Sequence, residues 1–232
     1  MKINKLGAFI GVEIQDLGVT NIHDKKIINK IAELLSEYSV VIIRNQNITD
    51  EEHIKFSEFF GELELTKVGT DGSGSKLVIL RNFDENGNIV PPSGRQRLNN
   101  LANQQWHSDS SFKIHPAHAS ILNGRTTPKI GGSTQFICMR NIYNKLDQSI
   151  QKQLDNLDAI HHFAHSRSKI DPTMVSQIEL DKFPPVVHPM VKINPVNHKK
   201  AVYFGSHTKS IKNLTDLEGS NLLKYLNGFI NN

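Results

Sequence analysis

A histidine and an aspartate two residues apart are the side chains in this sequence best suited to chemistry. They are His107 and Asp109, within the segment Trp106–Phe112. On a strand, residues i and i+2 face the same side, which would bring an imidazole and a carboxylate into one cavity. These are two of the three groups of a two-His, one-carboxylate facial triad, the ligand set that holds Fe(II) and leaves positions open. Such a spacing also arises by chance in a chain with 11 histidines, so a hydrogen-bonded His–Asp pair is the alternative.

The elements that would position this pair are an α/β first part and a β-rich second part. Apolar residues at helical spacing predict a helix from Asp24 to Tyr38, and Thr49 with Glu52 forms a capping box for the next. Further helices are expected over 141–157 and after a second capping box, Thr215-x-x-Glu218. Short strands are expected at 8–14, 40–43, 117–123, 133–139, 186–192 and 201–204. This pattern predicts a mainly β fold with flanking helices, as in an antiparallel barrel or jelly roll.

Residues 82–105 interrupt this pattern with Gly and Pro and show little periodicity. Loops of that length in a compact domain are often functional, so we expect a lid-like loop; a solvated, flexible insert is the alternative. The cations Lys76, Arg95 and Arg97 are candidates to receive a substrate carboxylate from this region, unless they only face water.

Composition excludes several classes of protein. Cys138 is the only cysteine, which excludes an intramolecular disulfide and any multi-Cys metal site and favours a reducing, cytoplasmic location. The longest apolar run, Val40–Ile43, is too short for a membrane span, and no signal-peptide core follows Met1. The net charge of +4 is scattered and forms no basic stripe, so we expect no nucleic-acid partner. The sequence leaves open whether the chain forms a homo-oligomer.

Five segments, in order, resemble the taurine/2,4-dichlorophenoxyacetate dioxygenase family. The resemblance runs from Leu6 nearly to the end and is greatest to the 2,4-dichlorophenoxyacetate branch. The segments are 103–112 (NQQWHSDSSF), the Pro-x-x-Gly-Gly-x-Thr turn at 128–134, 159–167 (AIHHFAHSR), 188–195 (HPMVKINP) and 203–211 (YFGSHTKSI).

The resemblance implies a double-stranded β-helix that carries an Fe(II)- and 2-oxoglutarate-dependent dioxygenase. His107 and Asp109 would be metal ligands, Thr134 would help to hold 2-oxoglutarate, and Asn103 is a candidate to face the substrate. A turn-forming loop Asn is the alternative for Asn103. The reaction would consume O2, release succinate and CO2, and hydroxylate a small anionic substrate. Hydroxylating an aryloxyacetate beside its ether oxygen gives a hemiacetal that decomposes to a phenol and glyoxylate.

The family's third metal ligand is a His in a later Trp-Asp-Asn-Arg segment, followed by an Arg that pairs with 2-oxoglutarate. The single Trp here is Trp106, and the sequence given ends at Asn232. We therefore expect one oxygenase domain over 1–232 that is truncated at its C-terminus, lacks its last strands, and has little or no turnover.

Other residues are weaker candidates for the missing groups. His188 and His207 are possible third ligands, and a helix would bring His161 and His162 onto one face with His165. Hydrogen-bonded or packed histidines are the alternative. Three arginines are candidates to pair with a carboxylate, and the sequence does not choose among them: Arg125, Arg140 and Arg167.

Three functions stay open at this point. The first is a dioxygenase for an aryloxyalkanoate, and the second is a taurine or alkyl-sulfate dioxygenase. The third is a degenerate jelly-roll protein that binds a ligand without catalysis. In each case Trp106 and Phe112 either line an aromatic pocket or pack in the core.

Overall fold

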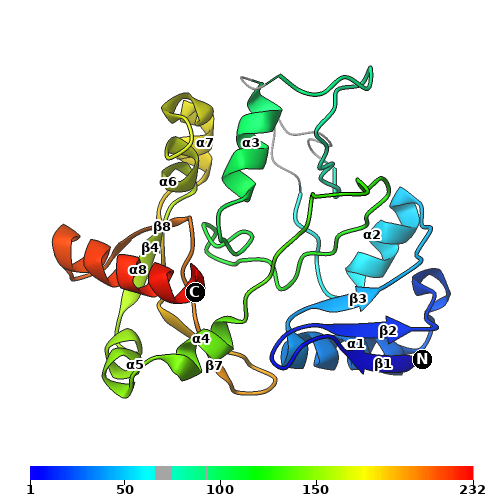
Figure 1. Ribbon diagram of the computed structural model, residues 1–232, viewed down its shortest axis with the longest axis horizontal. Helices are drawn as coiled ribbons and strands as arrows, with labels where there is room; N and C mark the ends of the chain where they lie inside the picture. The colour runs from blue at the N-terminus through cyan, green and yellow to red at the C-terminus, as the bar shows by residue number, and fades with distance from the viewer. Residues whose placement is uncertain (66–74, 92–93, 232) are drawn as a thin grey trace. The chain divides into compact units, whose positions relative to one another are not determined.

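The computed structural model describes residues 1–65, 75–91 and 94–231, which belong to two compact units (Figure 1). Unit 1 comprises residues 1–79, 118–141 and 193–199. Unit 2 comprises residues 80–117, 142–192 and 200–232. The described strands lie in three small sheets, of three, three and two strands. No helix in the described part of the chain is long and apolar enough to cross a membrane.

Unit 1 is built on a three-stranded sheet in the order β1-β2-β3. Strand β1 (Lys2–Lys5) pairs antiparallel with β2 (Val12–Gln15), which pairs parallel with β3 (Val41–Ile43). Helix α1 (Lys25–Tyr38) makes the crossover between β2 and β3, and the short 3-10 helix η1 (Val19–Asn21) precedes it. The apolar face of α1 packs on the sheet in a core that includes Val12, Ile14, Ile28, Ile31, Leu34 and Phe56.

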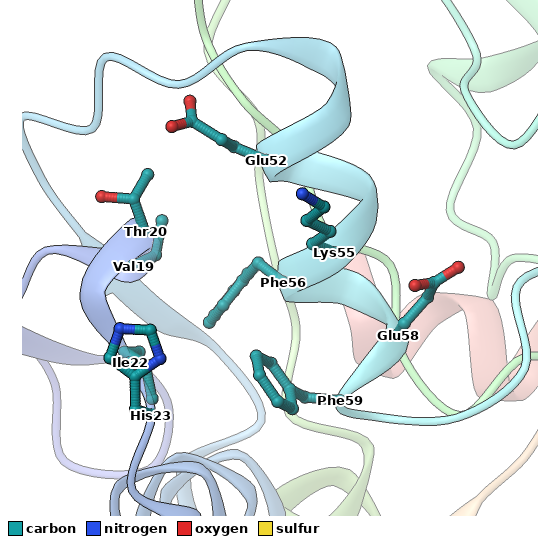
Figure 2. Close-up of a pocket in the computed structure, with 9 residues that line it drawn as sticks. All are labelled: Val19, Thr20, Ile22, His23, Glu52, Lys55, Phe56, Glu58 and Phe59. Carbon is teal, nitrogen blue, oxygen red and sulfur yellow. The ribbon is translucent and has the colours of Figure 1, made fainter.

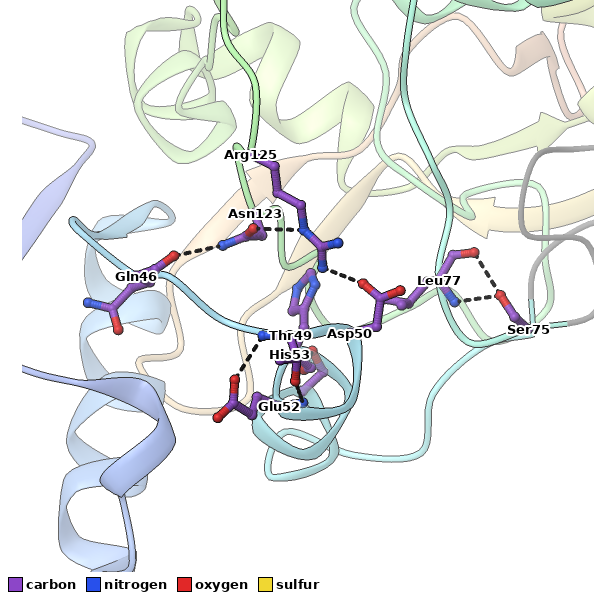
Figure 3. A network of polar contacts seen from close by, with 10 residues as sticks. Gln46, Thr49, Asp50, Glu52, His53, Ser75, Leu77, Asn123 and Arg125 are labelled. Atoms are coloured by element: carbon purple, nitrogen blue, oxygen red, sulfur yellow. Dashed lines mark hydrogen bonds and ion pairs between the residues drawn. The ribbon is translucent and has the colours of Figure 1, made fainter. Parts of the chain in front are cut away.

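The capping box predicted from the sequence is present at the start of helix α2 (Asp50–Glu58). The Thr49 N–H donates to Glu52 Oε2 at 2.8 Å, and the Glu52 N–H donates to Thr49 Oγ1 at 3.2 Å (Figure 3). These two bonds satisfy backbone donors that the first turn of a helix otherwise leaves without partners. The box therefore fixes where α2 begins and how Phe56 enters the core.

Replacing Thr49 with alanine should lower the free energy of unfolding by about 1 kcal/mol, because one N-terminal donor of α2 loses its acceptor. The measurement is urea unfolding followed by circular dichroism. Thr126→Ala, at an exposed threonine of the same unit, is the matched control and should leave the midpoint unchanged. Equal midpoints for the two variants would show that the box contributes nothing to stability.

Unit 2 contains the second three-stranded sheet, in the order β5-β4-β8. Strands β5 (Val186–Pro189) and β8 (Thr208–Ile211) both pair antiparallel with β4 (Asp158–His161), with a register shift between Ile160 and His161. Helix α8 (Asp216–Asn231) packs against β8 and buries Leu222, Leu226 and Ile230. The predicted box of Thr215 and Glu218 precedes α8, with the Thr215 N–H donating to Glu218 Oε2 at 2.9 Å.

Shorter elements complete the described chain. Strands β6 (Val191–Ile193) and β7 (Lys200–Val202) form a two-stranded hairpin. The remaining helices are α3 (Arg95–Asn103), α4 (Met139–Lys145), α5 (Gln148–Leu154), α6 (Phe163–Ser168), the 3-10 helix η2 (Pro172–Met174) and α7 (Gln177–Lys182).

Several predicted elements differ from the observed ones. Residues 117–123 and 133–139 form no strands, and α4 begins at Met139 instead. Residues 133–136 are exposed and pair with no neighbouring strand. The predicted helix over 141–157 is two helices, because Asp147 begins a new one. The predicted loop at 82–105 contains α3, although residues 92–93 lie outside the described part.

Candidate functional site

His107 and Asp109 lie together in unit 2, as the sequence predicts, but not on a strand. They follow α3 in an irregular turn in which Ser110 takes a left-handed conformation, with a φ of 56°. His107 Nε2 lies 3.2 Å from Asp109 Oδ1, and the two side chains are 26% and 57% exposed. A turn, rather than strand alternation, therefore brings the imidazole and the carboxylate to one accessible point.

The His107 ring is oriented by a backbone group. Nδ1 lies 2.7 Å from the Gln105 carbonyl oxygen, which accepts only from a protonated Nδ1, so Nε2 faces Asp109. Hydrogen bonding to Asp109, and then to the Gln105 carbonyl, raises the pKa of His107 against the opposing effect of burial. Metal-binding histidines commonly donate their second ring N–H to a carbonyl in this way. The donor set thus fits a metal ion that replaces the proton on Nε2.

The segment 203–207 packs directly on this turn. The Ser206 N–H donates to the Trp106 carbonyl at 2.8 Å, and the Ser108 side chain hydrogen-bonds Tyr203. A Cβ added to Gly205 would lie 3.0 Å from the Trp106 oxygen and 3.1 Å from His107 Cα, so the two backbones approach closely. The sequence shows this segment as part of the family resemblance, without indicating that it supports the His107 backbone.

His207 lies near the pair, whereas His188 is held elsewhere. The ring centroids of His107 and His207 are 6.4 Å apart. His207 Nδ1 lies 2.9 Å from Ser166 Oγ, which itself donates to the Phe163 carbonyl, so Nδ1 donates and Nε2 keeps its lone pair. Burial is the main reason why the pKa of His207 falls to about 3. His188 Nε2 instead lies 2.9 Å from the Lys113 carbonyl oxygen.

The helical two-His face suggested by the 161–165 spacing is wrong. His161 ends β4, His162 caps α6 and His165 lies within α6, so the three do not share one helix. His161 is 1% exposed, and neither of its ring nitrogens has a hydrogen-bond partner. Among the described residues, no group of three or more His, Cys, Asp or Glu side chains is arranged to hold a metal ion. The observed donor set is therefore the pair, with His207 beside it.

The structure distinguishes between the candidate cations. In unit 1, Arg125 forms an ion pair with Asp50 (Figure 3), and Arg140 donates to the Ser36 carbonyl at 2.6 Å. Lys76 pairs with Glu58 in the same unit. In unit 2, Arg95 lies 3.3 Å from Glu179.

Asn103 and Arg167 meet in unit 2, close to the pair. Arg167 Nη1 donates to Asn103 Oδ1 at 3.1 Å. Asp109 and Glu179 act electrostatically on Arg167, but burial has the larger effect and lowers its pKa. Asn103 thus holds an arginine beside the pair.

The two aromatic candidates have separate roles in unit 2. Phe112 makes edge contacts with the rings of Phe163, Phe183 and His207, at centroid distances of 5.0, 5.2 and 4.9 Å. The Trp106 indole N–H donates to Asn231 Oδ1 at 3.1 Å. An aromatic cluster therefore borders His207, and Trp106 is tied to the end of α8.

Thr134 is exposed in unit 1 and lies outside any strand. Its assignment to 2-oxoglutarate binding stays a prediction.

A pocket of about 500 Å³ lies in unit 1, between η1 and α2 (Figure 2). None of the predicted site residues lines it. Glu52 is engaged in the capping box and Glu58 is paired with Lys76, which leaves no arrangement of groups that resembles a catalytic site. The lining residues are Val19, Thr20, Ile22, His23, Glu52, Lys55, Phe56, Glu58 and Phe59.

Comparisons with known proteins agree with the geometry. A 2,4-dichlorophenoxyacetate dioxygenase of Cupriavidus pinatubonensis, described as alpha-ketoglutarate-dependent, is 31% identical over 96% of this chain and 79% of its own length. An (S)-phenoxypropionate/alpha-ketoglutarate-dioxygenase of Sphingobium herbicidovorans is 26% identical over 98% of this chain and 78% of its own length.

Solved structures share the fold. The crystal structure of AAD-2 with Mn(II) and N-oxalylglycine superposes with a TM-score of 0.84 at 28% identity, covering 98% of this chain and 81% of the other. A taurine dioxygenase from Burkholderia xenovorans superposes with a TM-score of 0.73 at 27% identity, covering 98% of this chain and 72% of the other. The profile of the "Taurine catabolism dioxygenase TauD, TfdA family" matches residues 2–232. The chain therefore belongs to the TauD/TfdA family of dioxygenases.

Proposed function

We propose that this protein is an Fe(II)- and 2-oxoglutarate-dependent dioxygenase in which His107 and Asp109 hold the metal. The observation that carries the proposal is the pairing of His107 Nε2 with Asp109 Oδ1 at 3.2 Å, on a ring whose other nitrogen is bound to a backbone carbonyl. Relatives described as alpha-ketoglutarate-dependent and the family match support the choice of co-substrate. The AAD-2 complex with Mn(II) and N-oxalylglycine supports a divalent metal.

Bound Fe(II) and 2-oxoglutarate supply the oxidising chemistry, which consumes O2, releases succinate and CO2, and hydroxylates a substrate C–H bond. The residues of this chain would hold the metal ion and orient its ligands. Gln105 fixes the His107 tautomer through its carbonyl oxygen, and Tyr203 contacts Ser108 between the two ligands. His207 presents a neutral ring beside them, so it adds no positive charge near the metal.

We propose an aryloxyalkanoate as the substrate, with taurine or an alkyl sulfate as the second candidate. A 2,4-dichlorophenoxyacetate dioxygenase is 31% identical and a phenoxypropionate dioxygenase 26% identical, whereas a sulfonate dioxygenase is 26% and a sulfate ester dioxygenase 22% identical. The aromatic cluster of Phe112, Phe163 and Phe183 beside His207 is chemically suited to an aryl ring. Thr134 is proposed to contribute to 2-oxoglutarate binding.

Two protein donors bind a metal more weakly than three and do not fix a facial geometry. We therefore expect low turnover from these residues, and the assay needs an excess of Fe(II).

The proposed activity is tested by incubating the protein with Fe(II), ascorbate, 2-oxoglutarate and one substrate at a time. Succinate is measured in every arm, with phenol from 2,4-dichlorophenoxyacetate, sulfite from taurine and sulfate from hexyl sulfate. The expected result is most succinate, with matching phenol, in the aryloxyacetate arm. Succinate matched by sulfite or sulfate would transfer the assignment to the second candidate. No succinate in any arm, together with no 2-oxoglutarate binding, would contradict the dioxygenase proposal.

A further inference from the structure

Arg167 is a half-buried cation with few hydrogen bonds, close to the proposed metal ligands. It lies in α6, and its Nη1 donates a hydrogen bond to Asn103 Oδ1 at 3.1 Å. Its Nε–H is buried and has no partner. A guanidinium carries five N–H donors, and donors buried without acceptors are costly. The side chain therefore has donor capacity that the described protein atoms do not use.

The acidic groups near Arg167 are engaged by other residues. Glu179 Oε2 accepts from the Ser176 N–H at 2.8 Å and lies 3.3 Å from Arg95. Asp109 Oδ1 faces His107. A metal ion on His107 and Asp109 would draw the Asp109 charge to itself, which would leave Arg167 with Glu179, a carboxylate that also pairs with Arg95. The site consequently favours a further anion at Arg167.

Arg167 differs from three other arginines in the partners that its guanidinium contacts. In unit 1, Arg125 pairs with Asp50 and Arg140 donates to a backbone carbonyl. In unit 2, Arg95 donates to the Met174 carbonyl and pairs with Glu179. Arg167 instead acts electrostatically on both His107 and His207. Its Cζ lies 5.4 Å from the centroid of the Phe163 ring, so an aromatic surface adjoins the guanidinium.

We propose that Arg167 binds a carboxylate of the ligand that enters beside His107 and Asp109, with Asn103 holding the guanidinium in position. The inference rests on the proposed function for the identity of that ligand. A planar guanidinium matches a carboxylate through two parallel N–H···O bonds, which a lysine cannot form. Two carboxylates are available in the proposed reaction, that of an aryloxyacetate and that of 2-oxoglutarate, and the experiment distinguishes them.

The test measures equilibrium binding to the protein loaded with Mn(II) and to the metal-free protein. Quenching of Trp106 provides the signal, because it is the only Trp and it precedes His107. The ligands are phenoxyacetate, 2-oxoglutarate, and phenoxyethanol as a neutral compound with the same ring. The variants are Arg167→Gln and Arg167→Lys. Lys152→Gln, which removes an exposed cation from α5 in the same unit, is the charge-matched control, and circular dichroism checks the folding of each variant.

We expect Arg167→Gln to weaken carboxylate binding by at least about 10-fold, the range for a hydrogen bond to a charged group. Arg167→Lys should fall between Arg167→Gln and the unchanged protein. Lys152→Gln should change binding less than about 2-fold, since exposed charges contribute little. Phenoxyethanol should bind equally to all variants. A loss confined to phenoxyacetate assigns Arg167 to the substrate, and one confined to 2-oxoglutarate assigns it to the co-substrate.

Unchanged binding of both carboxylates to folded Arg167→Gln or Arg167→Lys would overturn the proposal. Unmodified protein that binds Mn(II) but neither carboxylate would also overturn it, without affecting the metal site. Failure of the unmodified protein to bind Mn(II), with an Arg167-dependent loss of carboxylate binding in the metal-free arm, would overturn the metal site and leave the Arg167 proposal supported.

Discussion

Replacing Asp109 with alanine should lower the affinity for Mn(II) or Fe(II) by at least about 100-fold. This loss is larger than the typical loss on removing a residue that only hydrogen-bonds to a metal ligand. The variant removes one of the two donors and the anion that compensates the metal charge. His107→Ala should have a comparable effect, because the Gln105 carbonyl can no longer direct an imidazole nitrogen at the metal. Electron paramagnetic resonance of free Mn(II) measures the affinity.

Asp147→Ala is the matched control for this experiment. Asp147 is an exposed aspartate of the same unit, and its side chain makes no capping hydrogen bond to α5. Its replacement should leave Mn(II) affinity unchanged. If Asp109→Ala bound Mn(II) as tightly as Asp147→Ala does, the pair would be a structural hydrogen bond rather than a metal site. That outcome would support the hydrogen-bonded His–Asp pair, which is the alternative that the spacing of His107 and Asp109 leaves open.

Acidification should destabilise unit 2 through His161. Burial is the main cause that lowers the pKa of His161 to about 4, with His188 and Lys192 also opposing its positive charge. The unfolded chain binds a proton near the ordinary value of about 6.5, so the unfolded state holds more protons between pH 6.5 and 4. The contribution to stability is complete above pH 6.5 and is lost as the pH falls towards 4. The free energy of unfolding should fall by about 3 kcal/mol over this pH range through His161.

The surroundings of His161 explain why the proton is excluded. The ring stacks on Tyr203 at a centroid distance of 5.3 Å, and Lys192 Nζ lies 3.7 Å from the centroid of the same Tyr203 ring. The His188 ring contacts His161 edge-on at 5.3 Å. No acceptor among these groups compensates an imidazolium.

Urea unfolding at pH 7.5 and pH 5 measures this effect in the unmodified protein and in His161→Phe. Phenylalanine keeps the stacked ring and removes both nitrogens without partners. The number of protons taken up on unfolding should fall by about one in His161→Phe. The pH dependence that persists comes from other histidines with lowered pKa values, such as the half-buried His165 and the buried His207. His115→Phe, at an exposed histidine, should keep the full dependence. The same pH dependence in all three proteins would contradict the role of His161.

The features readable from sequence are those set by near neighbours along the chain. The capping boxes at Thr49 and Thr215 and the helical spacing of α1 involve residues three or four apart, and the structure contains them. The His107–Asp109 pair was predictable as a pair, yet a turn produces it, because no neighbouring strand pairs with 106–112. Helix α3 was missed since Gly and Pro before it mask the apolar spacing of Leu98, Leu101 and Ala102.

Features that depend on distant partners were not predictable. Which arginine keeps unused donors depends on contacts such as Arg125 with Asp50, 75 residues apart, and Arg140 with Ser36, 104 residues apart. The orphan nitrogens of His161 likewise result from three segments that meet in unit 2. Sequence spacing suggested a helix there, whereas pairing with β5 and β8 holds His161 in a strand.

The most direct test of the metal site is an anaerobic titration of the protein with Fe(II) followed by 2-oxoglutarate. A chelated 2-oxoglutarate on protein-bound Fe(II) gives a weak visible charge-transfer band. We predict that the band appears with the unmodified protein and with Asp147→Ala and is absent with Asp109→Ala. A band of equal strength in Asp109→Ala, or no band in the unmodified protein with Fe(II) in excess, would contradict a metal site at His107 and Asp109.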